Sequence, residues 1–439
     1  MAKLKQIIMA VLACVMLVGC YNEGESRLNV LKVYNWADYI GEGVLEDFQK
    51  YYKEQTGEDI HIVYQTFDIN EIMLTKIEKG HEDFDVVCPS EYIIERMLRK
   101  ELLLPIDTLF GSSPNYMNGI APYIRQQIDK LGTAENPATR YAVCYMWGTA
   151  GLLYNTRYVS AADMGTWGCL WDKRFSGHIL MKDAYRDSYG TALLYAYRKD
   201  LASGKKTVVN LMNDYSPAAM DTVEKYLKLL KPNVAGWEAD FGKEMMTKGK
   251  AWINMTWSGD AQWAIEEAEA VGVKLAYEVP REGSNIWYDG WVIPKYAKNR
   301  KAASYFINFL CRPDIALRNM EENGYVSSIA SPEIMQACID EEAPYVDASY
   351  FFGDSGKHVR LKNTQYPDIS VVQRCSMIRD FGDKTVNVLE IWQRVKGDNL
   401  NSGIVAFIFI VVALLCAWQI RRRWMEYRRS KQHRKRRKR

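Results

Sequence analysis

The alternation of strand-like and helix-like segments at the start of the chain constrains its fold most strongly. Short segments rich in β-branched and aromatic residues predict strands, and segments with apolar residues at helical spacing predict helices. The expected strands are residues 31–36, 60–67 and 84–88, and the expected helices are 43–52, 70–79 and 92–103. This alternating order predicts a mostly parallel sheet covered by helices, which is an α/β fold.

Two of these predicted strands end in loops suited to ligand binding. Open parallel sheets bind ligands beyond the carboxyl ends of their strands. Residues 36–39 (Trp-Ala-Asp-Tyr) and 89–92 (Pro-Ser-Glu-Tyr) follow strands and combine aromatic rings with a carboxylate or a hydroxyl. We therefore expect both loops to contribute to a ligand site.

A third candidate lies far along the chain at Asp289. Trp287 and Tyr288 precede this carboxylate, and Gly290 and Trp291 follow it. A carboxylate among aromatic residues is either a binding group or a costly burial. We interpret Asp289 as a binding group.

The sequence carries no signature of catalysis or of metal binding. The five His residues are scattered, and the Cys residues between positions 21 and 403 show neither CxxC nor metal-ligand spacing. No nucleophile elbow, Walker A loop or dinucleotide-binding motif occurs in a suitable context. We therefore expect no enzyme activity, no cofactor and no metal.

Both ends of the chain indicate export and membrane attachment. Residues 404–420 contain one polar side chain, and twelve of the nineteen residues that follow are Lys or Arg. This pattern predicts a transmembrane helix with a basic cytoplasmic tail at 421–439. Residues 1–20 resemble a lipoprotein signal that ends in Leu-Val-Gly-Cys, which implies lipidation of Cys20. The body would then lie on the periplasmic side of the inner membrane.

The charge balance of the exported body differs from that of the whole chain. The chain has 57 Lys and Arg against 54 Asp and Glu, but two of its basic residues lie in the leader, and twelve, with one acid, lie in the tail. The body keeps 43 basic and 53 acidic residues, a net charge of about −10. An acidic body suits cationic ligands and argues against nucleic acid.

A series of ordered motifs resembles the spermidine/putrescine-binding proteins of bacterial ABC importers. The likeness runs in order from about residue 31 to residue 396 and covers nearly the whole body. The segments that carry it are residues 34–40, 85–92, 145–148, 183–187, 255–259, 286–290, 306–314 and 324–325.

The resemblance implies a two-lobed periplasmic binding protein of type II that closes around its ligand and serves an ABC permease, as a monomer. Lobe 1 would comprise residues 28–145 and 290–330, and lobe 2 residues 146–289 and 331–398. The implied ligand contacts are Trp36, Asp38, Tyr39, Ser90, Tyr92, Asp187, Trp257, Trp287, Asp289 and Tyr325. Ala37 and Ala184 stand where some members carry a hydroxyl and a carboxylate, which implies a smaller set of anionic contacts.

The chemistry of a polyamine suits these residue types. Each buried ammonium needs a carboxylate against it, and the methylenes need apolar faces. A Trp or Tyr ring can serve both the cation and the methylenes. Two other functions stay open from the sequence: an anchored receptor that senses a polyamine or another organic cation, and an exported enzyme held by one membrane span.

Overall fold

The computed structural model describes residues 27–397. The predicted leader (1–20), membrane span (404–420) and basic tail (421–439) lie outside the described residues. The chain forms two compact units, of which the first ends at Gly382 and the second begins at Asp383. The described helix of the second unit is α18 (Thr385–Gly397). Between residues 27 and 397, no helix is both long enough and apolar enough to cross a bilayer.

The N-terminal elements of the first unit confirm the predicted alternation. Strand β1 (Val30–Trp36) pairs in parallel with β2 (His61–Phe67) on one side and with β3 (Val86–Val87) on the other. Helices α2 (Val44–Thr56), α3 (Asn70–Glu78) and α4 (Glu91–Arg99) follow these strands in turn. Apolar side chains of the strands and helices share one buried cluster, which explains why the alternating pattern predicts them well.

The helix predicted over residues 92–103 is too long. Helix α4 ends at Arg99, and Glu101 takes a left-handed backbone conformation with a φ of 52°. The chain then turns into β4 (Leu103–Leu104), which pairs with the end of β10. Apolar periodicity alone does not distinguish a last helical turn from a two-residue strand.

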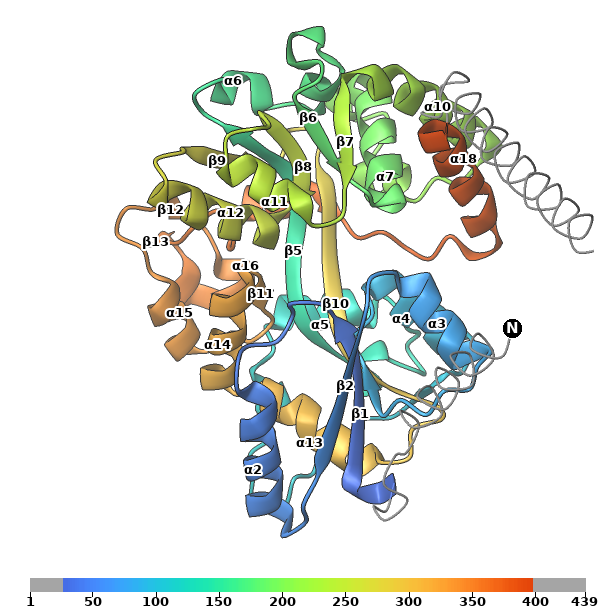
Figure 1. The fold of residues 1–439 in the computed structure, drawn as a ribbon, viewed down its shortest axis with the longest axis vertical. Helices are drawn as coiled ribbons and strands as arrows, with labels where there is room; N and C mark the ends of the chain where they lie inside the picture. Colours follow the sequence, from blue (N-terminus) through green and yellow to red (C-terminus); the bar gives the residue numbers. More distant parts are fainter. Residues whose placement is uncertain (1–26, 398–439) are drawn as a thin grey trace, which may run out of the picture. The chain divides into compact units, whose positions relative to one another are not determined.

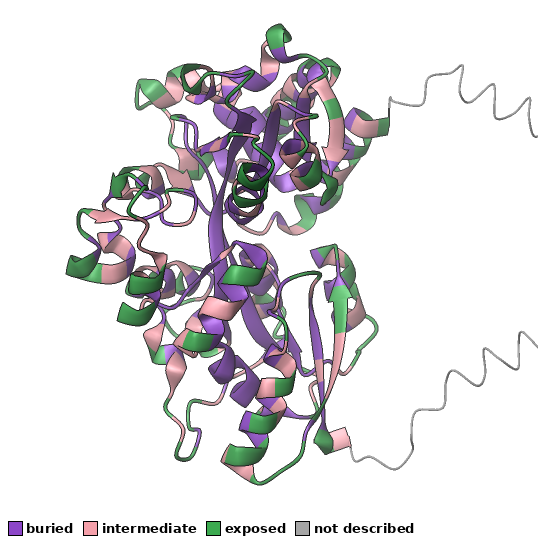
Figure 2. Cartoon of the chain, turned by 60° about the vertical axis from the view of Figure 1, so that its left-hand side comes forward, coloured by how far each residue is buried: buried purple, intermediate pink, exposed green. Residues whose placement is uncertain are grey.

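Two long strands connect the halves of the first unit. Strands β5 (Ala142–Asn155) and β10 (Ser284–Pro294) pair antiparallel and are buried along their whole length (Figures 1 and 2). Over residues 142–149, β5 pairs with β10, whereas over residues 150–155 it pairs with β8 and β9. The sheet order is β2-β1-β3-β10-β5-β8-β6-β7. The fold is therefore two-lobed and α/β, as the sequence predicts.

The second lobe is built on strands that run alongside the far half of β5. Strand β8 (Ile253–Trp257) pairs with β5, and β6 (Ile179–Lys182) lies in parallel between β8 and β7 (Val234–Glu238). Helix α7 (Tyr185–Ala196) follows β6 and is buried over most of its length. The residues that connect β6 to α7 therefore lie next to the carboxyl end of β8.

The remaining strands and helices complete the two lobes. The other strands are β9 (Leu275–Glu278), β11 (Val326–Ser327), β12 (Tyr345–Val346), β13 (Val359–Arg360) and β14 (Cys375–Ser376). The other helices are α5 (Pro122–Asp129), α6 (Ala161–Met164), α8 (Arg198–Ala202), α9 (Val208–Met212), α10 (Pro217–Leu230), α11 (Phe241–Thr247), α12 (Ser258–Ala270), α13 (Arg300–Leu310), α14 (Pro313–Asn323), α15 (Pro332–Cys338), α16 (Ser349–Phe352) and α17 (Ile369–Gln373).

Candidate ligand-binding site

Asp289 holds a buried carboxylate that has only neutral hydrogen-bond partners. It lies on β10, where the pairing register with β5 shifts before Gly290. The carboxylate accepts hydrogen bonds from the Tyr39 hydroxyl, at 2.9 Å, and from Ser90. Burial raises the pKa of Asp289 to about 6, although the hydrogen bonds from Ser90 and Tyr39 lower it. A cation placed against this carboxylate would favour its ionised form.

Three aromatic rings lie beside Asp289 and contact one another edge to face. The Tyr325 ring centroid is 5.5 Å from that of Tyr39 and 5.3 Å from that of Trp287. The Trp287 Nε1 atom is buried and has no hydrogen-bond partner among residues 27–397. This feature is shared by tryptophans inside and outside the candidate site, since the described residues include three more such Nε1 atoms, those of Trp36, Trp147 and Trp291.

The close packing of Tyr325 depends on Gly259 in the first turn of α12. A Cβ atom added to Gly259 would lie 2.1 Å from a carbon of the Tyr325 ring. A larger residue would therefore push Tyr325 away from Tyr39 and Trp287. This contact gives a physical role to the glycine in the segment 255–259.

A second buried carboxylate belongs to Asp187, in the first turn of α7. It accepts a hydrogen bond from Asn285 Nδ2 at 2.9 Å and one from Trp257 Nε1 at 3.4 Å. Burial raises the pKa of Asp187 above its ordinary value, while these neutral donors and, to a lesser extent, the charges of Arg186 and Lys182 lower it. Within residues 27–397, no Lys or Arg forms an ion pair with Asp187 or with Asp289.

Lys182 is a buried cation that the sequence analysis does not identify. Its Nζ atom lies 2.6 Å from Asp260 Oδ2, 3.4 Å from Glu238 Oε1 and 4.6 Å from the centroid of the Trp257 ring. The other oxygen of Asp260 accepts a hydrogen bond from the Tyr325 hydroxyl at 2.8 Å. Lys182 directly precedes Asp183, and Asp260 directly follows Gly259. Each therefore lies next to a recognisable segment, but nothing in the sequence indicates that they meet.

The structure brings together most of the residues expected at the site, but not all of them. The first group is Tyr39, Ser90, Trp287, Asp289 and Tyr325, and the second is Asp187 with Trp257.

Three expected residues make other contacts. Trp36 packs against Phe67, with ring centroids 4.5 Å apart. Asp38 is exposed and has a left-handed φ of 50°. The Tyr92 hydroxyl accepts a hydrogen bond from Asn70. The same Asn70 amide donates to the Ser90 hydroxyl at 3.0 Å, so one residue links Tyr92 to the first group. Among residues 27–397, no direct hydrogen bond or ring contact joins Trp36, Asp38 or Tyr92 to either group.

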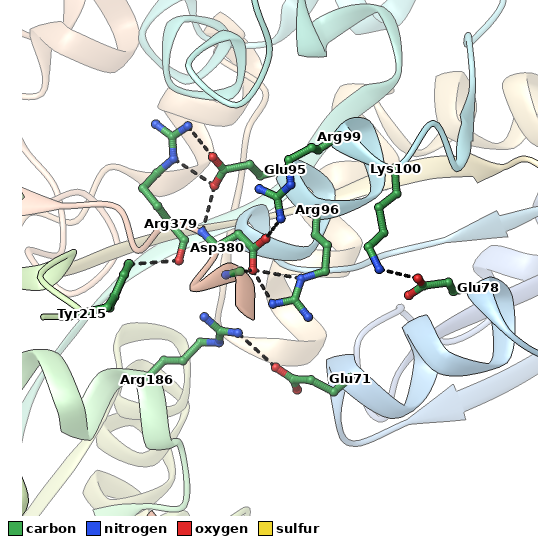
Figure 3. A network of polar contacts seen from close by, with 11 residues as sticks. Glu71, Glu78, Glu95, Arg96, Arg99, Lys100, Arg186, Tyr215, Arg379 and Asp380 are labelled. Carbon is green, nitrogen blue, oxygen red and sulfur yellow. Dashed lines mark hydrogen bonds and ion pairs between the residues drawn. The ribbon is translucent and has the colours of Figure 1, made fainter. Parts of the chain in front are cut away.

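A network of charged side chains links the helices of one lobe to elements of the other (Figure 3). Arg379 forms two hydrogen bonds with Glu95, at 3.0 and 2.7 Å, and Asp380 pairs with Arg96 and Arg99 of the same helix, α4. On α7, the Nη2 atom of Arg186 lies 3.3 Å from the Oε1 atom of Glu71, which belongs to α3. We call these contacts the interlobe network.

The interlobe network is continuous with the candidate site. The Arg186 guanidinium stacks over the Tyr92 ring at 3.9 Å, and the Tyr185 hydroxyl donates to Glu71 at 2.6 Å. Arg186 directly precedes Asp187, and Tyr92 lies on α4, two residues after Ser90 at the start of that helix. The network therefore reaches the candidate site at Arg186, beside Asp187, and at Tyr92.

Comparison with known proteins agrees with this architecture. The chain is 28% identical over 371 residues to the spermidine/putrescine-binding periplasmic protein of Escherichia coli K12, covering 84% of this chain and 92% of the relative. It is 29% identical over 297 residues to the putrescine-binding periplasmic protein PotF of the same organism, with 65% and 74% of the two chains covered.

Solved structures give the same result. The spermidine/putrescine ABC transporter substrate-binding protein PotD of Streptococcus pneumoniae is 30% identical, with a TM-score of 0.61 and coverage of 84% of this chain and 98% of that one. A putative spermidine/putrescine ABC transporter protein of Listeria monocytogenes is 28% identical, with a TM-score of 0.66 and coverage of 84% and 99%. The model of the bacterial extracellular solute-binding proteins matches residues 46–334. The chain belongs to that family of bacterial extracellular solute-binding proteins.

Proposed function

We propose that this protein captures a polyamine between its two lobes outside the cytoplasm and delivers it to an ABC permease. The observation that carries the proposal is the pair of buried carboxylates, Asp187 and Asp289, neither of which has a cationic partner among the described residues. The names of the relatives support the same ligand class.

The surroundings of the two carboxylates suit a flexible chain with an ammonium at each end. Burying an unpaired charge is costly, so an ionised Asp187 or Asp289 favours a bound cation. The rings of Trp257 and Trp287 offer faces to the methylenes and attract the cations by roughly 0.5–2 kcal/mol each. Ligand contact by the two carboxylates and the two tryptophans stays a prediction. The same holds for ligand contact by Trp36, Asp38 and Tyr92.

Ligand capture would close the lobes about β5 and β10. The segment 146–148 directly precedes the point where β5 changes partners, and Gly290 follows the register shift in β10. A ligand that touches both lobes binds the closed state more tightly and so increases its population. The proposed lobes are residues 28–145 with 290–330, and 146–289 with 331–398.

The function is tested by calorimetry on the full chain in detergent micelles, titrated with putrescine, spermidine and lysine. Saturable binding of at least one polyamine, with none of the amino acid, is expected. Absence of heat from both polyamines, with a folded protein confirmed by circular dichroism, would reject the proposed function.

The interlobe network should adjust affinity through the closed state. Replacing Glu95 by Gln leaves the two Arg379 hydrogen bonds without a charged acceptor, so polyamine affinity should fall about threefold to tenfold, as expected for a partly exposed pair. The loss should shrink at high salt. Glu78→Gln is the matched control, because Glu78 pairs with Lys100 inside one lobe. Equal calorimetric affinities for Glu95→Gln and Glu78→Gln would remove the network from closure.

Anchoring at both ends is part of the proposal. Lipid on Cys20 and a span over residues 404–420 would hold the body at the periplasmic face of the inner membrane, beside its permease. Protease added to spheroplasts should then degrade the body and spare an epitope tag placed after Arg439. Digestion of that tag in intact spheroplasts would contradict the orientation.

A further inference from the structure

Lys182 places a cation of the protein itself beside the aromatic residues of the site. The side chain is 2% exposed, and its Nζ atom lies 4.6 Å from the Trp257 ring centroid. Trp257 also donates a hydrogen bond to Asp187. The cation of Lys182 and a ligand cation at Asp187 would therefore share the same aromatic residue.

The Lys182 cation lies between the carboxylates of Asp260 and Glu238. Lys243 supplies a second cation beside Asp260, so these two carboxylates are balanced by two lysines. One Asp260 oxygen pairs with Lys182 at 2.6 Å, and the other accepts from Tyr325 and lies 3.8 Å from the Nζ atom of Lys243. Burial alone would lower the pKa of Lys182, but the charges of Asp260 and Glu238 raise it above the ordinary value. Burial would raise the pKa of Asp260, but Lys182 and Lys243 hold it below the ordinary value. Both groups are charged at neutral pH.

The other carboxyl groups close to the site offer no further place for a cation. Glu91 is buried and accepts a hydrogen bond from the Tyr288 backbone, and burial raises its pKa well above the ordinary value, which disfavours its charged form. Asp38 is exposed to solvent, where an ion pair contributes little. Two carboxylates, Asp187 and Asp289, therefore stay available to ligand ammonium groups.

From this count of charges, we infer that Lys182 sets the ligand specificity by filling a third cation position with its own ammonium, so that the site prefers a diamine to a triamine. The inference rests on the proposed function. A triamine would have to bury its additional ammonium without a free carboxylate, close to the like charge of Lys182. The inference concerns the number of ammonium groups on the ligand, not the length of its chain.

The test compares spermidine with 1,8-diaminooctane, which has the same chain length and lacks the inner amine. Calorimetry is done on the full chain in detergent micelles. The wild-type protein should bind the diamine about tenfold or more tightly than spermidine, since one uncompensated charge is worth at least this factor. Tighter binding of spermidine by the wild-type protein would overturn the inference.

Substitution of Lys182 tests the cause of the preference. In Lys182→Met, Asp260 and Glu238 lose their buried partner, and the ratio of the two dissociation constants should shift toward spermidine by about tenfold or more. Lys182→Arg keeps the cation and should keep the wild-type ratio. Lys243→Met removes a partly exposed lysine from the same carboxylate and serves as the matched control, with little change expected.

The outcomes separate the inference from the proposed function. If putrescine, spermidine and 1,8-diaminooctane all fail to bind the wild-type protein, the proposed function fails. If putrescine alone binds, chain length sets the preference and the inference fails by itself. If 1,8-diaminooctane binds and a folded Lys182→Met protein keeps the wild-type ratio, the specificity role of Lys182 fails alone. If Lys182→Met does not fold, as judged by circular dichroism, the wild-type comparison decides.

Discussion

Replacing Asp289 by Asn is expected to weaken polyamine binding by about 2–5 kcal/mol, the cost of removing one side of a buried charge pair. The amide keeps the size of the side chain and can still accept hydrogen bonds from Tyr39 and Ser90, which the carboxylate accepts in the structure. It cannot neutralise an ammonium. The loss should therefore be measurable by calorimetry with no loss of thermal stability.

Asp38→Asn tests whether another carboxylate of the predicted site also binds an ammonium. Asp38 lies in the same predicted site but is exposed, and its charge is screened by water. We expect less than about 1 kcal/mol of change in binding for this variant. If Asp38→Asn weakened binding as much as Asp289→Asn did, the cation position would lie at the surface loop instead of at β10.

The burial of Asp289 agrees with its sequence context, while its role in binding stays a prediction. Aromatic residues on both sides of an acid in a strand leave it no solvent, so its burial follows from the pattern itself. The parallel pairing of β1 with β2 and β3 follows in the same way from the alternation of segments.

The Lys182 contact could not be predicted from the sequence, since it depends on tertiary structure. Lys182 is the last residue of β6, and Asp260 lies in α12, the helix that follows β8. The two residues meet because β6 and β8 pair in parallel. A lysine at the end of a strand is ordinarily exposed, and only the packing of Trp257 and Asp260 around it buries the charge.

Tyr92 shows a second limit of prediction from sequence motifs. Its place in a recognisable segment predicts a ligand contact, but the guanidinium of Arg186 covers its ring at 3.9 Å. The arginine also lies 4.1 Å from the Phe381 ring, so its position is set by two lobes at once. The motif identifies the residue type at this place, whereas the partner of the ring depends on how the lobes meet.

The affinity for a polyamine should fall as the pH drops below about 6, because burial raises the pKa of Asp289 to about 6 in the ligand-free protein. Amines of this class keep their protons over the whole range, so the change belongs to the protein. A protonated Asp289 is neutral and cannot pair with an ammonium. Each binding event below pH 6 should therefore release about one proton, with the affinity falling up to about tenfold per pH unit.

The same raised pKa has the opposite effect on the fold. Protonated Asp289 stabilises the folded, ligand-free protein, and this contribution is present at low pH and is lost as the pH rises through about 6. Calorimetry at pH 5.5 in two buffers of different ionisation enthalpy measures the proton release, and Asp289→Asn should reduce it. The raised pKa of Asp187 leaves a smaller release in that variant. Identical proton release in the wild-type protein and in Asp289→Asn would show that Asp289 does not meet the ligand cation, even if the variant binds weakly.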